Sequence, residues 1–273
     1  MYNSKKEIEE YQKQNGLKTK GTKTFGEVMT PLFLVNDMLD TLPKEVWTNP
    51  HLKWLDPCNG IGTFFSVVVE RLMNGLHSFE PDKELRYKHI IENMLWACEI
   101  QDSIIETYNK IFNPENKFKL NIINADYLKT KFFDKFDVIV MNPPYQELKE
   151  GNKKSKALWH LFVEKTVQDL VRGGYLVAVH PDGWRSPGEG NYVRAKAVLR
   201  KKQLLYLEVH NGKDGNKTFK CHTPYDFYCL ENEEAYKNTL IKCTDGTIEE
   251  VFIPSKAFIP NGMFAEFDRL MGV

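Results

Sequence analysis

Short apolar runs alternate with amphipathic stretches along most of the 273-residue chain. Apolar runs that end at turn residues are typical of buried strands, and apolar positions repeated every three or four residues indicate helices. Strands are predicted at residues 52–55, 94–100, 118–123, 138–141, 175–179, 204–209 and 225–230. Helices are predicted at residues 32–42, 65–72, 102–111, 159–171 and 192–202. This alternation predicts one large α/β domain.

The ends of the chain and its glycine pairs complete the pattern. Residues 1–21 are mostly polar, which predicts a frayed helix or a partly ordered arm. Gly173-Gly174 is predicted to end the helix 159–171 as its C-cap, and residues 211–216 read as a glycine-rich turn. Thr239 to Ile253 predicts a hairpin about Asp245-Gly246.

Charge is balanced over the whole chain, with 37 basic and 37 acidic residues, so overall charge does not indicate a nucleic acid partner. Basic residues nevertheless gather between residues 192 and 220, where only Glu208 and Asp214 are acidic. This run could face a phosphate backbone, or it could be a solvated helix face, and charge alone favours the second. The basic residues are Arg194, Lys196, Arg200, Lys201, Lys202, Lys213, Lys217 and Lys220.

The five cysteines are scattered, odd in number and free of any Cys-x-x-Cys pair. They are predicted to be reduced thiols, and neither a zinc or other metal site nor a disulfide framework is indicated. No apolar run reaches membrane-spanning length, and the N-terminus lacks the apolar segment of a signal peptide. We therefore expect a cytoplasmic protein that has no membrane partner.

Asp137 to Tyr145 carries the most specific chemistry of the chain. The apolar run after Asp137 stops at Asn142-Pro143-Pro144-Tyr145, which predicts a buried strand that ends in a rigid turn. This turn offers two acceptors, the side-chain oxygen of Asn142 and the carbonyl of Pro143, beside the ring of Tyr145. Such a group suits a planar exocyclic amine, which has two hydrogens to donate and a flat face for stacking.

The four residues 142–145 resemble the catalytic motif of amino-methyltransferases that use S-adenosylmethionine (SAM), above all the DNA adenine-N6 family of restriction-modification systems. The resemblance implies that Asn142, Pro143 and Tyr145 are catalytic and that Asn142 also borders the cofactor. The same motif occurs in enzymes that methylate the glutamine amide of peptide release factors and in some rRNA methyltransferases. A strand followed by a stiff proline turn is the purely structural alternative.

Thr30 before Pro31 is typical of a helix N-cap with proline at the first helical position. The amide donors and positive dipole of such a helix end can hold a carboxylate, although an ordinary capped helix explains the pattern as well. Residues 24–31 resemble the motif that precedes the cofactor loop in one circular arrangement of the family, which implies that Thr30 binds the cofactor. In this arrangement the cofactor region precedes the catalytic region, and target recognition comes last.

Residues 56–64 predict a glycine loop between a strand and a helix, the arrangement that brings a ligand close to the backbone in α/β sheets. The spacing Asp-Pro-x-x-Gly-x-Gly-x-Phe resembles the SAM loop of the family. The resemblance implies that Gly60 and Gly62 let the chain pass the methionine part and that Cys58 lies in the same loop. Asp56 is implied to hold the amino end, directly or through water.

Acidic residues follow the next two predicted strands. Glu99 ends the strand 94–100, and in nucleotide-binding α/β folds an acid in this place grips a ribose diol. A surface acid at a strand end is the alternative. The resemblance implies that Asp126 accepts from the adenine amino group of SAM and that Tyr127 packs on the adenine ring.

The resemblance also implies which residues touch the substrate. Pro144 and Tyr145 border the target base, and Phe219 packs on its opposite side, with Tyr225 as the alternative to Phe219. Residues 146–156 are polar and predict a mobile flap over the substrate. We interpret His180 as structural or substrate-lining, because this chemistry needs no base to activate a nucleophile.

The family implies a Rossmann-like sheet of seven strands, mostly parallel, with an antiparallel last strand. It implies a polar arm at residues 1–21, a SAM-dependent methyltransferase domain at 22–232, and a hairpin at 233–273 where a target-recognition domain would begin. Family members normally carry a substantial target-recognition domain there, so independent sequence-specific DNA binding is in doubt.

The implied activity is methyl transfer from SAM to the N6 amine of adenine in DNA after base flipping, with S-adenosylhomocysteine as the other product. The expected partner is DNA, and a separate target-recognition subunit or a cognate endonuclease is a possible further partner. The first alternative is a methyltransferase for another amine or amide, such as cytosine N4, an RNA base or a protein glutamine. The second alternative is a catalytic subunit that needs a separate DNA-recognition chain.

Overall fold

The computed structural model describes residues 3–16, 29–147, 156–186, 192–256, 258–264, 266 and 269. Its strands are β1 (Trp54–Asp56), β2 (Leu95–Glu99), β3 (Asn121–Asn124), β4 (Phe136–Met141), β5 (Leu170–Pro181), β6 (Lys202–His210), β7 (Tyr225–Glu234), β8 (Thr239–Lys242) and β9 (Ile248–Val251).

Eight α-helices are described, and five short helical turns accompany them. The α-helices are α1 (Ser4–Asn15), α3 (Leu32–Leu39), α4 (Thr63–Gly75), α5 (Lys83–His89), α6 (Asp102–Phe112), α7 (Trp159–Asp169), α8 (Val193–Lys201) and α9 (Gly212–Phe219). The turns are η1 (Lys44–Trp47), η2 (Ile90–Met94), η3 (Tyr127–Lys129), η4 (Asp182–Arg185) and η5 (Ile253–Ser255). None of these helices has both the length and the apolar character needed to cross a membrane.

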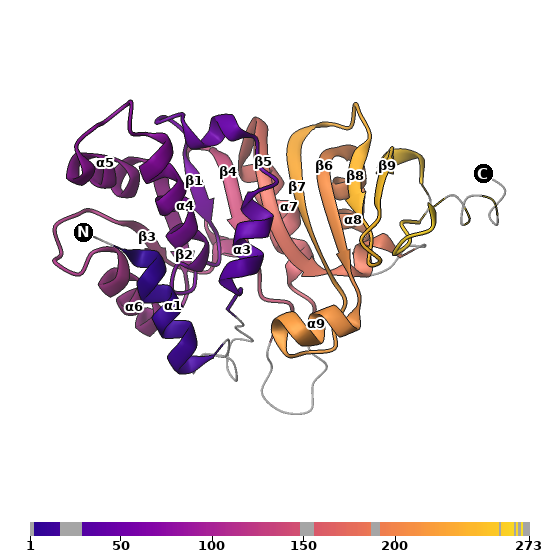
Figure 1. Cartoon of the computed structure of the whole chain (residues 1–273), viewed down its shortest axis with the longest axis horizontal. Helices are drawn as coiled ribbons and strands as arrows, with labels where there is room; N and C mark the ends of the chain where they lie inside the picture. The colour runs from indigo at the N-terminus through magenta and orange to yellow at the C-terminus, as the bar shows by residue number, and fades with distance from the viewer. Residues whose placement is uncertain are drawn as a thin grey trace.

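The strands form one sheet in the order β3-β2-β1-β4-β5-β7-β6-β8-β9 (Figure 1). Pairing is parallel from β3 to β5, and β7 runs antiparallel to both β5 and β6. The mostly parallel sheet and the antiparallel seventh strand are therefore confirmed. The predicted count of seven strands is wrong, because the hairpin of β8 and β9 pairs with the open edge of β6, where Tyr206 lies opposite Leu240.

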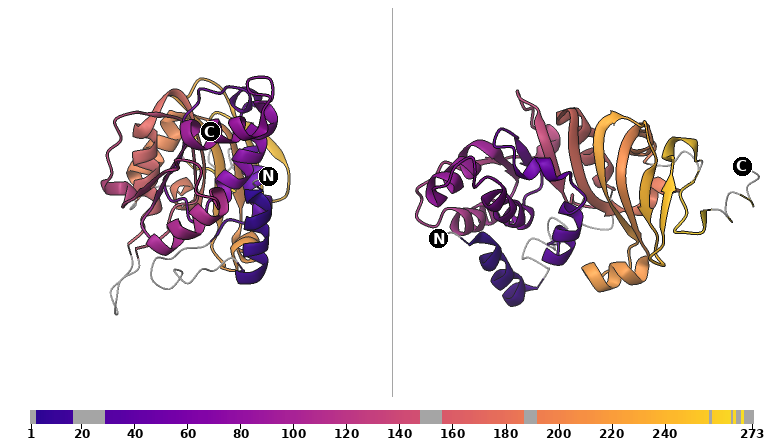
Figure 2. Two further views of the ribbon diagram at one scale, coloured as in Figure 1. Left: turned by 90° about the vertical axis from the view of Figure 1, so that its left-hand side faces the viewer. Right: turned by 45° about the horizontal axis from the view of Figure 1, so that its top comes forward.

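Two hydrophobic cores lie on the two faces of the sheet, with α3 and α4 on one face and α7 and α8 on the other (Figures 1 and 2). Alternate residues of β4 serve the two cores. Val138 and Val140 belong to the core under α3 and α4, whereas Ile139 and Met141 belong to the core under α7. A strand covered on both faces needs apolar residues at every position, which explains the continuous run from Val138 to Met141.

The N-terminal helix is part of the folded structure. Residues 4–15 form α1, which packs on α4, and Ile8 is fully buried between them. An ion pair of 2.7 Å between Lys5 and Glu70 joins the same two helices. The predicted frayed arm is therefore a docked helix as far as residue 16, and residues 17–28 lie outside the described residues.

The glycine pair at 173–174 lies inside β5 and does not end a helix. The helix α7 stops at Asp169, and β5 begins directly at Leu170. A side chain at Gly174 would come within 2.8 Å of the carbonyl oxygen of Asp137, so the neighbouring strand requires glycine here. The pairing of β4 with β5 shifts register at the same place. The predicted C-cap was wrong because a strand bulge and a helix end both favour glycine.

The predicted turn at 211–216 is the first part of a helix, α9. Asn211 caps this helix by accepting hydrogen bonds from the backbone of Lys213 and Asp214, while the Asp214 carboxylate accepts from the Asn211 backbone at 3.0 Å. This reciprocal capping box stabilises a helix start despite the two glycines. The Asn-x-x-Asp spacing was the signal in the sequence that indicated a helix.

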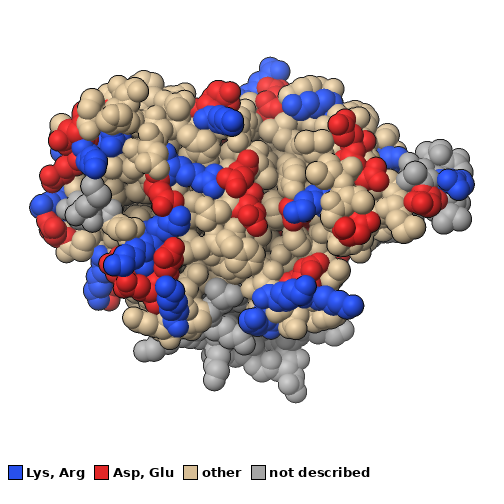
Figure 3. All heavy atoms as spheres, viewed as in Figure 1, with Lys and Arg blue, Asp and Glu red and all other residues tan. Residues whose placement is uncertain are grey.

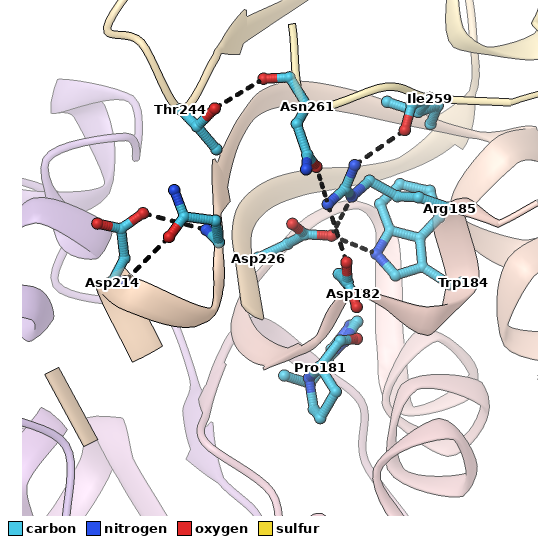
Figure 4. A network of polar contacts seen from close by, with 11 residues as sticks. Pro181, Asp182, Trp184, Arg185, Asp214, Asp226, Thr244, Ile259 and Asn261 are labelled. Atoms are coloured by element: carbon cyan, nitrogen blue, oxygen red, sulfur yellow. Dashed lines mark hydrogen bonds and ion pairs between the residues drawn. The ribbon is translucent and has the colours of Figure 1, made fainter. Parts of the chain in front are cut away.

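A buried ion pair connects the sheet to the segment that follows the hairpin (Figure 4). The Arg185 guanidinium donates from Nε to Asp226 Oδ2 at 2.8 Å and from Nη1 to the carbonyl of Ile259 at 2.8 Å. Trp184 donates to the same oxygen of Asp226 at 3.0 Å. Burial raises the pKa of Asp226 to about 6, although the charge of Arg185 opposes this shift.

The Asp226→Ala substitution should lower the free energy of unfolding by about 3–5 kcal/mol, because it removes the fully buried carboxylate that pairs with the buried Arg185 charge. Asp182→Ala is the matched control: Asp182 also contacts Arg185, but its side chain is 35% exposed, so a loss of about 0–1 kcal/mol is expected. Urea unfolding measures both values. Equal losses in the two variants would contradict the assigned importance of the buried pair.

Candidate active site

A cavity of about 510 Å³ lies at the edge of the sheet where β1, β2 and β4 end. Parallel strands deliver their carboxyl ends to one edge, so residues far apart in the sequence meet there. All but one of the predicted site residues line this cavity. They are Thr30, Asp56, Cys58, Gly60, Glu99, Asp126, Tyr127, Asn142, Pro143, Pro144, Tyr145 and Phe219.

Gly62 is the predicted site residue that does not line the cavity. Its φ of 89° is left-handed, and a Cβ added there would come within 2.5 Å of the Phe112 ring and 2.8 Å of the Tyr108 ring. These rings belong to α6. Gly62 therefore allows α6 to pack against the start of α4, and its implied role beside the cofactor stays a prediction.

Glu99 joins the glycine loop to the start of α6. Its Oε2 accepts from the backbone N–H of Gly60 at 3.0 Å, and its Oε1 accepts from those of Ile100 at 2.8 Å and Gln101 at 2.9 Å. These bonds hold the carboxylate in one orientation at the tip of β2. The same group that was predicted to grip a ribose thus also shapes the loop.

Asp56 is a buried acid at the tip of β1, only 1% exposed. Its Oδ1 accepts from the backbone N–H of Cys58 at 3.1 Å. Burial, with a smaller contribution from the negative charge of Glu99, raises the pKa of Asp56 to about 8, although the hydrogen bond from Cys58 opposes the shift. A carboxyl group in this environment favours a positively charged ligand, because a cation stabilises its ionised form.

Asn142 is held at the end of β4 by Thr30. The side-chain Nδ2 of Asn142 donates to the hydroxyl of Thr30 at 3.0 Å, and the backbone carbonyl of Thr30 accepts from Gln12 of α1 at 3.0 Å. The helix α3 begins at Leu32, its N-cap is Pro31, and no side chain caps it. The predicted N-cap at Thr30 is therefore wrong, and its hydroxyl instead fixes the direction of the Asn142 amide.

The aromatic residues predicted to contact a substrate also lie on the cavity. The ring of Tyr145 packs against the core under α7, and the backbone carbonyl of Tyr145 accepts from Leu158 at 3.0 Å. Phe219 ends α9 and meets the ring of Tyr225 edge-on at 5.0 Å between centroids. Phe219 lines the cavity, and its alternative Tyr225 does not.

Asp126 and Tyr127 follow β3 and form the wall beside Glu99. The carboxylate of Asp126 accepts from the backbone of Leu128 and so caps η3. The Tyr127 ring stacks on Phe162 of α7 at 5.5 Å, and its hydroxyl donates to Asp169 at 2.7 Å. Contacts from α7 therefore hold the Tyr127 ring in place.

His180 is buried away from the cavity. Its ring stacks on Trp159 at 4.2 Å and lies 3.1 Å from the hydroxyl of Tyr228. Burial lowers its pKa to about 4, so the ring is neutral near pH 7. This agrees with a structural role.

Most of the predicted flap at residues 146–156 lies outside the described residues, because the structure does not describe residues 148–155.

Several lining residues were not singled out by sequence analysis. Ile100 is the clearest case, an apolar side chain 51% exposed directly after Glu99. The signal in the sequence was that Ile100 directly follows Glu99, an acid that was predicted to bind a ligand. Others come from elements whose docking on the sheet only the fold determines. They include Cys98, Gln101, Leu158, Phe162 and Cys221.

The strand order and the cavity at the edge of the sheet are those of the SAM-dependent methyltransferase fold. The chain aligns with a protein described as a class I SAM-dependent methyltransferase from Listeria monocytogenes at 16% identity and a TM-score of 0.58, over 88% of this chain and 72% of that one. It aligns with the M protein of the type I restriction enzyme EcoKI at 14% identity and a TM-score of 0.56, over 78% and 47%.

Residues 54–219 match the family described as Eco57I restriction-modification methylase, and the chain belongs to this family. A curated relative from Mycoplasma pneumoniae, described as an uncharacterized adenine-specific methylase, is 28% identical over 253 residues. That alignment covers 64% of this chain and 59% of the relative.

The raised pKa of Asp56 predicts a pH-dependent affinity for SAM. Below its pKa of about 8 the carboxyl is mostly protonated, and only its ionised form attracts the ammonium group of SAM. The affinity for SAM should therefore rise by roughly tenfold or more from about pH 5.5 to about pH 7.5. Over this range a free α-amino group such as that of SAM stays mostly protonated, so the change reports on the carboxyl group. Equilibrium dialysis with labelled SAM measures this.

Asp56→Asn is the control for this pH dependence. The variant should bind SAM weakly and with an affinity that changes little over the same pH range, since no carboxyl remains to ionise. A pH profile parallel to that of the unmutated protein would show that another group is responsible.

Proposed function

We propose that this chain transfers a methyl group from SAM to the exocyclic N6 amine of adenine in DNA. The observation that carries this proposal is that residues 142–145 and the loop 56–60 open into one cavity. An amine acceptor site and a site for a cationic cofactor must share one cavity for direct transfer. The family of the chain and its adenine-specific relative support the same activity.

The cofactor half of the cavity is formed by the tips of β1, β2 and β3. Asp56 holds the ammonium end, Gly60 allows close approach of the backbone, and Glu99 binds the ribose while it keeps its bonds to the loop. Asp126 and Tyr127 hold the adenine. The cluster of buried carboxylates fits a ligand with positive charge on its sulfur and its amine. When bound, SAM supplies an electrophilic methyl group.

Asn142 and Pro143 act on the amine of the substrate. The side-chain oxygen of Asn142 and the carbonyl of Pro143 accept its two hydrogens, which draws the nitrogen lone pair out of conjugation with the ring. The bond from Nδ2 to Thr30 fixes the amide, so that its oxygen faces the opposite way. As the new N–C bond replaces the methyl–sulfur bond, with S-adenosylhomocysteine as the leaving group, the two oxygens stabilise the positive charge that develops on the nitrogen. The nitrogen then releases one proton to water.

The target base reaches this position only outside the duplex. Flipping costs a few kcal/mol, and stacking recovers about 1–3 kcal/mol per base. Tyr145, beside Pro144, and Phe219 supply the two apolar surfaces that line the cavity near Asn142. A flipped adenine is held between these two rings.

A second candidate is a catalytic subunit that acts with a separate target-recognition chain. The similarity to the M protein of a type I restriction enzyme supports it. In this form the methyl transfer chemistry is unchanged, and site selection on DNA belongs to the partner. Methylation that appears only after a recognition chain is added would distinguish this form from an independent enzyme.

The Asn142→Ala substitution should lower methyl transfer by more than roughly a hundredfold, because it removes one of two acceptors that stabilise the transition state. The affinity for SAM should change little. The assay is incubation with labelled SAM and unmethylated genomic DNA, followed by digestion to nucleosides and mass spectrometry. Methylated deoxycytidine as the product would correct the target base, and lost SAM binding would contradict the role of Asn142.

The Thr30→Val substitution separates two roles for Thr30. If the hydroxyl positions Asn142, kcat should fall roughly fivefold, as expected for one lost hydrogen bond of about 1 kcal/mol, while the KM for SAM stays constant. Thr30→Ser keeps the hydroxyl and should restore kcat. A raised KM for SAM with unchanged kcat would instead support the cofactor role predicted from the sequence.

A further inference from the structure

The basic run of residues 192–220 is divided between two places in the fold. Its first half forms α8, which packs against α7 on one face of the sheet. There Lys201 pairs with Glu234 at 3.4 Å, and Lys196 donates to the carbonyl of Ser186. Its second half forms α9, which connects β6 to β7 along the chain and lies at one end of these strands (Figures 1 and 2). The two halves therefore have different surroundings.

The lysine row consists of two lysines of α9 and the lysine that follows it. Lys213 and Lys217 are four residues apart and so lie on one face of the helix, and Lys220 is the C-cap residue that ends it. All three are exposed, and the row is visible as blue side chains over α9 in Figure 3. Within the part of the chain that the structure describes, no ion pair joins any of these lysines to an acid.

The acid of this helix does not neutralise the lysine row. Asp214 is turned toward the helix start, where it accepts from the backbone of Asn211 at 3.0 Å. It belongs to the capping box, and its charge stabilises the positive N-terminal end of the helix. The three positive charges are therefore available for a partner with negative charge.

The lysine row reaches the rim of the cavity. Phe219 and Cys221 both line the cavity, and the exposed Lys220 lies between them. Lys220 has a left-handed φ of 56°, a conformation that is uncommon for a residue with a side chain. This turn ends α9 and directs the chain back along the rim. A base in the cavity carries its own phosphates to this rim, because they are covalently attached to it.

α9 is held firmly against the rim. A Cβ at Gly215 would come within 2.1 Å of the carbonyl oxygen of Thr223, and a Cβ at Gly212 within 2.8 Å of the His222 ring. The inner side of the helix thus packs directly on the segment that continues the rim. Its lysines keep a defined position relative to the cavity.

We infer that Lys213, Lys217 and Lys220 bind backbone phosphates of the DNA strand whose base enters the cavity. This inference rests on the proposed function, because it takes the occupant of the cavity to be a base of DNA. Lysines one helical turn apart are separated by about 6 Å along the axis, so their flexible side chains can reach successive phosphates. The contacts position the strand and carry no sequence information.

The test compares two triple variants in the full chain. K213Q/K217Q/K220Q removes the lysine row of α9, and R194Q/K201Q/K202Q removes the same number of charges at and beside α8. Fluorescence anisotropy with a labelled DNA duplex gives the binding constant at several salt concentrations. The slope of log K against log salt is negative, and each lost phosphate contact makes it less steep by about 0.9. The slope of the α9 variant should therefore be less steep than that of the unmutated protein by about 3. For the α8 variant the difference should be less than about 1.

The affinity of each variant for SAM shows that the cavity is intact and is expected to match that of the unmutated protein. Equal losses of slope in the two triple variants, or an unchanged slope in the α9 variant, would overturn the inference while the proposed function stands. An unmutated protein that binds SAM but no DNA at low salt would overturn the proposed function and the inference with it. If the α9 variant binds DNA as tightly as the unmutated protein does but binds an acidic polypeptide more weakly, the inference is overturned and the lysine row belongs to a protein partner.

Discussion

β1 is hydrogen-bonded to β2 on one side and to β4 on the other, with Trp54 level with both Leu95 and Val138. This central position determines where the chemistry lies, because parallel neighbours end at the same edge and their last side chains converge. Asp56, Glu99 and Asn142 are distant in sequence but border one cavity for this reason. One hydrophobic core on each face of the sheet holds β1, β2 and β4 in register, and the two cores thereby also hold the site in place.

The polar groups at this edge hold one another in position. Glu99 accepts three backbone hydrogen bonds from the loop after β1 and the start of α6, and the hydroxyl of Thr30 orients the amide of Asn142. Each group is thereby fixed before a ligand arrives, which lowers the cost of ordering the site. Asp56 differs, because its burial makes its ionised form costly and its charge depends on what binds beside it.

The second half of the sheet contributes one wall of the cavity. α9 connects β6 to β7 and places Phe219 in the cavity and lysines at its rim. β6 brings the chain to this edge, and β7 starts there and runs away from it, with Tyr225 opposite both His210 and Pro181. The buried pair of Arg185 and Asp226 ties this half to the segment beyond β9. The lining of the cavity therefore comes from two regions of one continuous sheet.

Local residue pattern was enough to predict the strands, the glycine loop, the Asn-Pro-Pro-Tyr turn and the hairpin about Gly246, because each depends on neighbours within a few residues. It did not reveal that this hairpin extends the sheet, that Gly174 makes room for a neighbouring strand or that Gly62 makes room for α6. It also missed that the hydroxyl of Thr30 contacts Asn142, which is 112 positions away. These features are decided by contacts between distant segments, which only the folded chain brings together.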